Sequence, residues 1–234
     1  RVIGYTMKKI MVWDLYVRLF HWSLVIAFLL SSFSAFQDKV MTGYDVMHLN
    51  AGLTILVLAT SRFIWGFVGS TTALFTSFLR GPRSIVRHLR SISVKGSVSY
   101  TYVGHNPLGG WFVIIILIAL IVQAMMGLYS NDSILFEGPL AASLDENLSN
   151  QITDYHKILG IIIIALAILH VASVLLYSIG KGIELIKPMV FGYKVVSDTL
   201  TEDQSQEQTL RFVSPLWALT LFLITGYVWC WFIF

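Results

Sequence analysis

Four of the chain's six histidines lie within long apolar stretches: His21, His48, His156 and His170. An imidazole is costly to place in hydrocarbon, so an ionisable residue inside a membrane span marks a functional site by default. Taken singly, each of these histidines could serve only as a hydrogen bond across a helix interface. Their spacing is more informative than any one of them.

His156 and His170 share one apolar stretch and are separated by fourteen residues. In a helix that separation is about 21 Å of rise and close to four turns. It also equals two heptads, so in a left-handed helical bundle both imidazoles point the same way. A single helix is therefore predicted to present two possible ligands on one face, at two depths.

The elements that position these histidines are five apolar stretches, each long enough to cross a bilayer core of about 20 helical residues. They cover residues 15–36, 48–68, 108–129, 155–179 and 212–234. The 234 residues are 56% apolar and 12% charged, with a mean hydropathy of +0.74. This composition excludes disordered, collagen-like and nucleic-acid-binding classes. We predict an all-α integral membrane protein, in which a four-helix bundle is followed by a fifth, C-terminal membrane helix.

The predicted organisation has four parts. Residues 1–10 form an N-terminal segment, in which residues 1–6 precede Met7, a candidate translation start, and are not assigned to the native fold. Residues 11–194 form the four-helix domain, 195–211 an acidic cytoplasmic linker, and 212–234 the additional helix. Asp14 is the expected N-cap of the first helix, and Pro107 is expected to open the third.

Basic residues gather on one side of the predicted spans. They precede the first helix, fill the connection between the second and third, and follow the fourth: Lys8, Lys9, Arg18, Arg80, Arg83, Arg87, Arg90, Lys95, Lys181, Lys187 and Lys194. The other side holds Lys39 and the acids of the loop 130–154, which are Asp132, Glu137, Asp145, Glu146 and Asp154. Because basic connections remain in the cytoplasm, the N-terminus is predicted to be cytoplasmic. The acidic loop and the C-terminus then face the opposite side.

The basic connection after Pro82 places Ile85, Leu89 and Ile92 on one helical face and its arginines on another. This pattern fits a short helix lying in the membrane interface with arginines against lipid phosphates. It fits a solvated basic loop equally well. His88, among these arginines, is expected to be solvated or interfacial.

Topology pairs the four histidines by depth. The first helix enters from the cytoplasm, so His21 lies toward the inner side, as His170 does. The second helix enters from outside, so His48 lies near the outer surface, as His156 does. Two bis-histidine sites stacked in a four-helix bundle require a planar cofactor with two axial ligands, and that cofactor is haem. The chain has no Cys-x-x-Cys-His motif, so we predict two non-covalent b haems per chain.

Both outer histidines are followed four residues later by glycine, as His48/Gly52 and His156/Gly160. A porphyrin edge pressed against a helix needs such a missing side chain. Gly52 and Gly160 are therefore predicted to pack against the outer haem, with simple helix packing as the alternative.

Three motifs, together with the four histidines, resemble the bacterial di-haem cytochrome b561 family. They are residues 12–22 (VWDLYVRLFHW), 62–69 (RFIWGFVG) and 104–109 (GHNPLG). This superfamily includes the b-type cytochrome subunit of nickel–iron hydrogenases and the gamma subunit of formate dehydrogenase. The resemblance covers about residues 11–194. It implies a four-helix core with two b haems in the bacterial inner membrane.

The resemblance also implies electron exchange with membrane quinone or quinol and with a redox partner. The partner is expected at the periplasmic face and is a c-type cytochrome or a hydrogenase-like enzyme. Arg62, His105 and Asn106 are candidates for a quinone pocket at the inner level, and Arg62 is also a candidate partner of a haem propionate.

Two other functions fit parts of the pattern. The chain could be a stand-alone quinone-linked oxidoreductase that acts on a small oxidant such as superoxide or ferric iron. Alternatively, its histidines could relay protons or bind a transported metal, a function that predicts acidic residues inside the spans. Those spans are nearly free of acids, and the acidic outer loop favours a docked redox partner.

Overall fold

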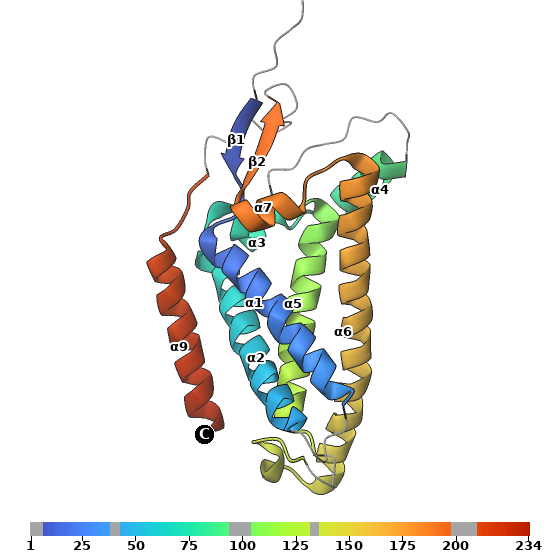
Figure 1. Ribbon diagram of the computed structural model, residues 1–234, viewed down its shortest axis with the longest axis vertical. Helices are drawn as coiled ribbons and strands as arrows, with labels where there is room; N and C mark the ends of the chain where they lie inside the picture. Colours follow the sequence, from blue (N-terminus) through green and yellow to red (C-terminus); the bar gives the residue numbers. More distant parts are fainter. Residues whose placement is uncertain (1–6, 38–42, 94–103, 132–135, 198–209) are drawn as a thin grey trace, which may run out of the picture. The chain divides into compact units, whose positions relative to one another are not determined.

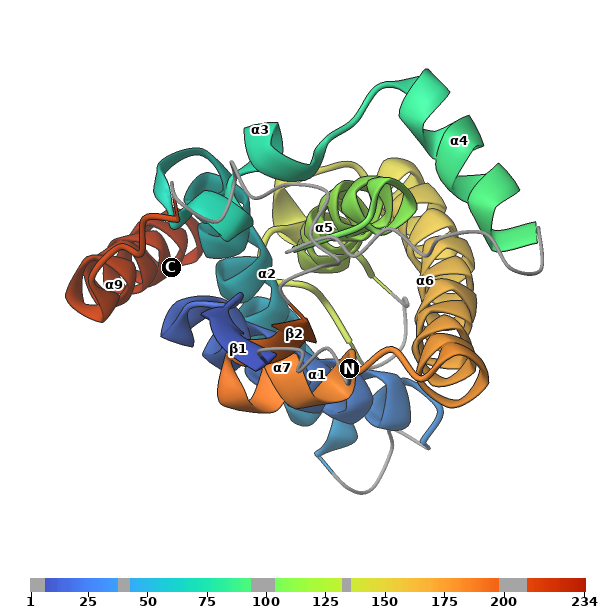
Figure 2. The same ribbon diagram turned by 90° about the horizontal axis from the view of Figure 1, so that it is seen from above.

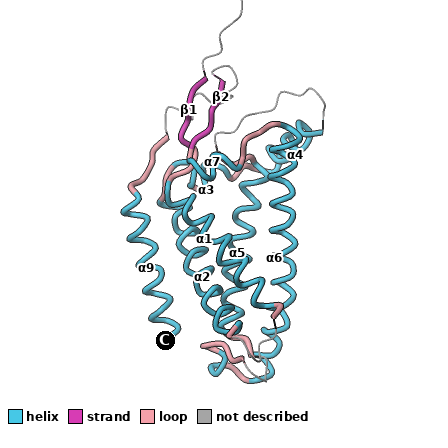
Figure 3. Tube along the Cα trace, viewed as in Figure 1, coloured by secondary structure: helices cyan, strands magenta, loops and turns pink. Residues whose placement is uncertain are grey.

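The computed structural model describes residues 7–37, 43–93, 104–131, 136–197 and 210–234. Residues 1–6, Lys39, Lys95, Asp132 and most of the predicted linker, 198–209, lie outside these ranges. The described chain is largely helical (Figure 3) and forms two compact units. Unit 1 comprises Arg1–Arg18, Ile64–Ile114 and Val174–Ala218, and unit 2 comprises Leu19–Phe63, Ile115–Ser173 and Leu219–Phe234.

Five helices are long and apolar enough to cross a membrane (Figure 1). They are α1 Leu15–Ala35, α2 Tyr44–Val68, α5 Pro107–Leu128, α6 Glu146–Lys181 and α9 Pro215–Ile233. Many of their large apolar side chains are exposed, as along α6 and α9. Lipid is as apolar as these side chains, so they have no drive to be buried. The predicted all-α membrane fold with five spans is confirmed.

The starts of the first and third spans agree with the capping predictions. The Asp14 carboxylate accepts a hydrogen bond from the Val17 backbone N–H at 2.7 Å, which caps α1. Pro107 is the first residue of α5, where its missing N–H costs nothing.

The fourth span begins earlier than predicted. Asp145 caps α6 by accepting the Leu148 N–H at 3.0 Å, so the helix starts at Glu146. The predicted outer loop 130–154 is therefore wrong in its second part, which is helical. The short helix η2 (Ala141–Ser143) lies in the connection that remains.

In unit 2, the parts of α1, α2, α5 and α6 lie side by side (Figures 1 and 2). The part of α9 in this unit packs on α2, where the Trp229 indole N–H donates to the Thr60 hydroxyl at 3.3 Å. A core of Leu56, Leu128 and Ile233 joins α2, α5 and α9. The fifth helix thus has defined contacts with the bundle within unit 2.

Unit 1 contains a short antiparallel sheet that the sequence patterns do not indicate. Strand β1 (Met7–Met11) pairs with β2 (Tyr193–Ser197), with Met7 opposite Ser197 and Met11 opposite Tyr193. Residues 195–197, which open the predicted linker, therefore pair with the N-terminal segment.

Gly192 makes the turn between α7 (Ile186–Phe191) and β2 possible. Its φ of 89° is in the left-handed region, which strongly favours glycine. Its carbonyl accepts the backbone N–H groups of Val12 and Trp13 at 2.7 and 3.0 Å. A Cβ at this position would lie 3.1 Å from the Trp13 carbonyl oxygen.

The basic connection of unit 1 contains η1 (Thr71–Ala73), α3 (Phe75–Phe78) and α4 (Pro82–Ser93). The segment Pro82–Ser93 is therefore helical, as the first alternative predicts, while its place in the membrane interface stays a prediction. Arg83, Arg87 and Arg90 of α4 are exposed. His88 is only 7% exposed, so the expectation that it is solvated is wrong, and a place at the membrane interface stays a prediction. It lies one helical turn from the half-buried Ile85, on the less exposed face of α4.

Candidate functional site

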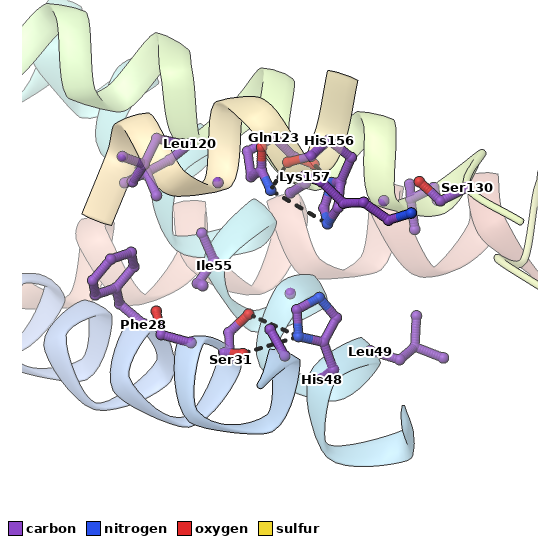
Figure 4. A pocket seen from close by; sticks show the side chains of 18 of the residues that line it. Phe28, Ser31, His48, Leu49, Ile55, Leu120, Gln123, Ser130, His156 and Lys157 are labelled. Atoms are coloured by element: carbon purple, nitrogen blue, oxygen red, sulfur yellow. Dashed lines mark hydrogen bonds between the residues drawn. The ribbon is translucent and has the colours of Figure 1, made fainter. Parts of the chain in front are cut away.

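Unit 2 contains a cavity of about 370 Å³ whose walls come from α1, α2, α5 and α6. Most of its lining is aliphatic or aromatic, including Phe28, Ile55 and Leu120 (Figure 4). His48 and His156 also line it. A mainly apolar cavity with a few convergent polar groups is the usual form of a cofactor site.

The imidazoles of His48 on α2 and His156 on α6 face each other across this cavity (Figure 4). Their ring centroids are 6.0 Å apart and their planes are nearly perpendicular, at 84°. This is the pair that the sequence predicts for the outer site, and the structure brings both residues together within unit 2.

Backbone carbonyls set the tautomer of both rings. His48 Nδ1 is 2.9 Å from the Ser31 carbonyl oxygen, and His156 Nδ1 is 3.0 Å from the Gln123 carbonyl oxygen. A carbonyl only accepts hydrogen bonds, so each Nδ1 carries the proton and each Nε2 keeps a lone pair. This is the arrangement of a metal-ligating histidine with an outer-shell partner.

The geometry of this pair fits a bis-histidine metal centre. Metal–imidazole bonds of about 2 Å on opposite sides of one metal ion place the two ring centroids roughly 6 Å apart. The donor set is two neutral imidazoles, which is the chemistry of axial haem ligation, and the wall beside His48 leaves space. Gly52 has no atom within 4 Å of a Cβ built on it.

Gly160 has a different neighbour from Gly52. A Cβ on Gly160 would lie 3.1 Å from the side-chain nitrogen of Gln123, although Gly160 also lines the cavity. Sequence reasoning missed Gly127, where a Cβ would lie 3.1 Å from Cε1 of His156. It also missed Gln123, because an isolated glutamine in an apolar helix carries no periodic signal.

The inner candidates, His21 on α1 and His170 on α6, also belong to unit 2. Nδ1 of His21 is buried and has no hydrogen-bond partner among the described residues, whereas the His170 side chain is exposed. His21 also packs edge-on against Trp22, with ring centroids 5.2 Å apart.

Three further sequence candidates are Arg62, His105 and Asn106. Arg62 of α2, in unit 2, is only 2% exposed. In unit 1, the His105 ring packs 4.6 Å from Trp13 and 4.7 Å from Phe78, measured between centroids. The Asn106 side chain accepts the Gly109 N–H at 2.7 Å and so caps α5.

Segments of all three sequence motifs meet inside unit 1. Asp14, from the first motif, accepts the indole N–H of Trp65, from the second, at 3.1 Å. Trp13, also from the first, packs on His105 from the third. These motif residues therefore hold segments of unit 1 together.

A helical membrane protein in which two half-buried imidazoles face each other across a mainly apolar cavity has the donor set that a membrane b-type cytochrome requires. The family model described as prokaryotic cytochrome b561 matches residues 12–192, and the chain belongs to that family. The resemblance read from the motifs is thereby confirmed. The family binds b-type haem and acts in membrane electron transfer. No curated protein and no solved structure matches the chain significantly.

Proposed function

We propose that this cytochrome carries electrons across the bacterial inner membrane through two b haems. The outer haem is held by His48 and His156, and the inner haem by His21 and His170. Electrons pass between membrane quinone or quinol and a periplasmic redox partner. The observation that carries the proposal is the facing pair of outer imidazoles, with centroids 6.0 Å apart.

When bound, b haem supplies a one-electron couple whose potential the surrounding protein adjusts. The chain supplies four imidazoles and an apolar environment for it. Its carbonyls at Ser31 and Gln123 orient the two outer rings. The lining of the cavity, with Gly52 beside His48, leaves room for a planar group.

The two depths come from α6, which carries both His156 and His170. Their separation of fourteen residues corresponds to about 21 Å of helix rise. The helix thus supplies one ligand near each leaflet. This spacing supports a path for electrons across the membrane rather than a single haem site.

Sidedness follows from the distribution of charge. Basic connections place the N-terminus in the cytoplasm and the C-terminus in the periplasm. The connection before α6 then faces the periplasm with Glu137 and Asp145, and Glu146 follows as the first residue of α6, the helix that carries His156. Opposite charges steer redox partners into brief encounters, so a partner with a basic face fits this surface. A c-type cytochrome is the first choice, and a hydrogenase-like enzyme is the second.

We assign quinone to the inner side, and the family resemblance supports this assignment. Arg62, His105 and Asn106 are the candidate polar groups for quinone or for a haem propionate. Membrane lipid surrounds the spans, and Arg83, Arg87 and Arg90 of α4 are exposed to meet its phosphates.

The conduit can be tested in vesicles that contain the purified protein and a quinol, with a basic c-type cytochrome outside. Each quinol gives up two electrons and two protons, and two molecules of cytochrome are reduced. We expect His48→Ala to abolish this transfer and Tyr227→Phe, an exposed position on α9, to leave it unchanged. Transfer at the normal rate in His48→Ala would contradict the route through the outer site.

A further inference from the structure

Gln123 of α5 makes a set of contacts with His156 of α6 that no sequence motif predicts. Its backbone carbonyl accepts the His156 Nδ1 proton at 3.0 Å. Its side-chain nitrogen donates to the His156 carbonyl at 3.0 Å. The same nitrogen lies 3.3 Å from His156 Nε2. The residue thus contacts both ring nitrogens and the backbone of one candidate ligand.

The side-chain oxygen of Gln123 is buried and has no hydrogen-bond partner among the described residues. A buried acceptor without a partner is destabilising. The amide is nevertheless held in place, because its nitrogen donates a hydrogen bond to the His156 carbonyl. The absence of a side chain at Gly160 leaves space for the amide. A Cβ on Gly160 would approach that nitrogen to 3.1 Å.

The direction of this amide dipole has an electrostatic consequence. With Nδ1 of His156 protonated, Nε2 is the atom that would bind iron, and the N–H end of the amide faces it. The N–H end carries partial positive charge. In a cavity of low dielectric such a charge acts strongly on its neighbours. It disfavours the more positive, ferric state of an iron bound there.

The outer ligand on the opposite side has a different neighbour. His48 Nδ1 is bonded to the Ser31 carbonyl and lies 3.4 Å from the hydroxyl oxygens of Ser31 and Ser34. Both hydroxyls lie at Nδ1, whereas Gln123 directs its amide to the iron-binding nitrogen. The effect of Gln123 is therefore specific to the His156 side.

We infer that Gln123 is a positioning residue for the outer haem: it orients His156 through its backbone and raises the haem reduction potential through its side-chain amide. This inference rests on the proposed outer haem at His48 and His156. Outer-shell partners of this kind orient the ligands of a metal centre and tune its properties.

The test is a potentiometric titration of the purified protein, with absorbance and low-temperature electron paramagnetic resonance recorded for each haem. Gln123→Leu removes the dipole at similar volume, and Gln123→Glu replaces it with a carboxylate. Gln151→Leu, at an exposed position on α6, is the matched control. We expect the midpoint potential of one haem to fall in Gln123→Leu and to fall further in Gln123→Glu. The second haem and the control keep wild-type values.

The outcomes separate this inference from the proposed function. Suppose that Gln123→Leu and Gln123→Glu each keep two haems per chain, with wild-type midpoint potentials and spectra. This result would overturn the role of Gln123 and leave the ligand assignment intact. If Gln123→Leu loses a haem, Gln123→Met, of similar length, is titrated in its place and must show the same downward shift. An equal shift of both haems would also overturn the inference. The ligand assignment is checked separately by haem content in His156→Ala.

Discussion

The two histidine pairs of unit 2 differ in how firmly the surrounding protein fixes the orientation of their imidazole rings. In the outer pair, carbonyls of Ser31 and Gln123 fix both tautomers, and the rings face each other at 6.0 Å. In the inner pair, His21 has a buried Nδ1 without a partner among the described residues, and His170 is exposed. The outer site is preorganised for a ligand, and the inner site is organised less completely.

The difference follows from the neighbouring helices. Each outer ring lies beside a carbonyl of another helix: α1 supplies the one at His48 and α5 the one at His156. Preorganised ligands lose less freedom on binding, so they bind more tightly for the same contacts. We therefore expect the outer haem to be held more firmly than the inner one.

The largest expected effect is the loss of one haem from a single ligand variant. His48→Ala and His156→Ala should each remove the outer haem, and His21→Ala and His170→Ala the inner one, because a low-spin bis-histidine centre needs both imidazoles. Reduced-minus-oxidised spectra with haem quantified per chain measure this. Two low-spin haems in either α6 variant would break the pairing.

The next effect concerns the outer surface. Reversing Glu137 and Glu146 to lysine should slow electron exchange with a basic c-type cytochrome several-fold and leave both haem spectra intact. Asp145 is changed only to Asn, because Asn keeps a hydrogen-bond acceptor for the N-cap of α6. Asp145→Ala would remove this cap and lower the folding stability by about 1 kcal/mol.

The same exchange should slow as salt rises, since exposed charges are screened within about 10 Å at 0.1 M. Stopped-flow rates over a range of ionic strength provide the measurement. A rate that responds to neither salt nor charge reversal would leave this surface as a simple connection.

A smaller effect is expected on the rate of haem reduction by quinol when the candidate polar groups of the inner side are changed. We expect Arg62→Ala, His105→Ala and Asn106→Ala to slow haem reduction by quinol, with Glu137→Gln as the control on the outer side. Asn106→Asp preserves the cap of α5, so it separates a quinone role from a capping role. Unchanged rates in all of them would favour a quinone site on the outer side.

The smallest effect should come from the glycines around the outer rings. Gly127→Ala places a Cβ 3.1 Å from Cε1 of His156, so the ring must shift by a few tenths of an ångström. We expect a modest shift of the outer haem's spectrum and midpoint, with the inner haem unchanged. The control is Gly81→Ala, because a Cβ added at Gly81 meets no atom within 4 Å and the φ of this residue is ordinary. Gly43→Ala would be a poor control, since the positive φ of Gly43 disfavours alanine. Equal spectra in Gly127→Ala and wild type would mean that the ring position is not critical.

Much of this organisation can be predicted from the sequence, because membrane helices carry a strong apolar signal and Asp14 and Pro107 mark helix starts. The outer pair also follows from spacing and topology. The strands β1 and β2 could not be predicted, since they pair residues far apart in the chain and their pattern is short. Gln123 and Gly127 act through contacts between α5 and α6, which no local pattern records.

The pairing of ligands is tested most directly by double variants with haem counted per chain. His48→Ala combined with His156→Ala removes both ligands of one predicted site, so we expect one haem to remain, as in either single variant. His48→Ala combined with His170→Ala removes a ligand from each site, so we expect no low-spin haem. Retention of one haem in the second double variant, or loss of both in the first, would contradict the assignment of two bis-histidine haems.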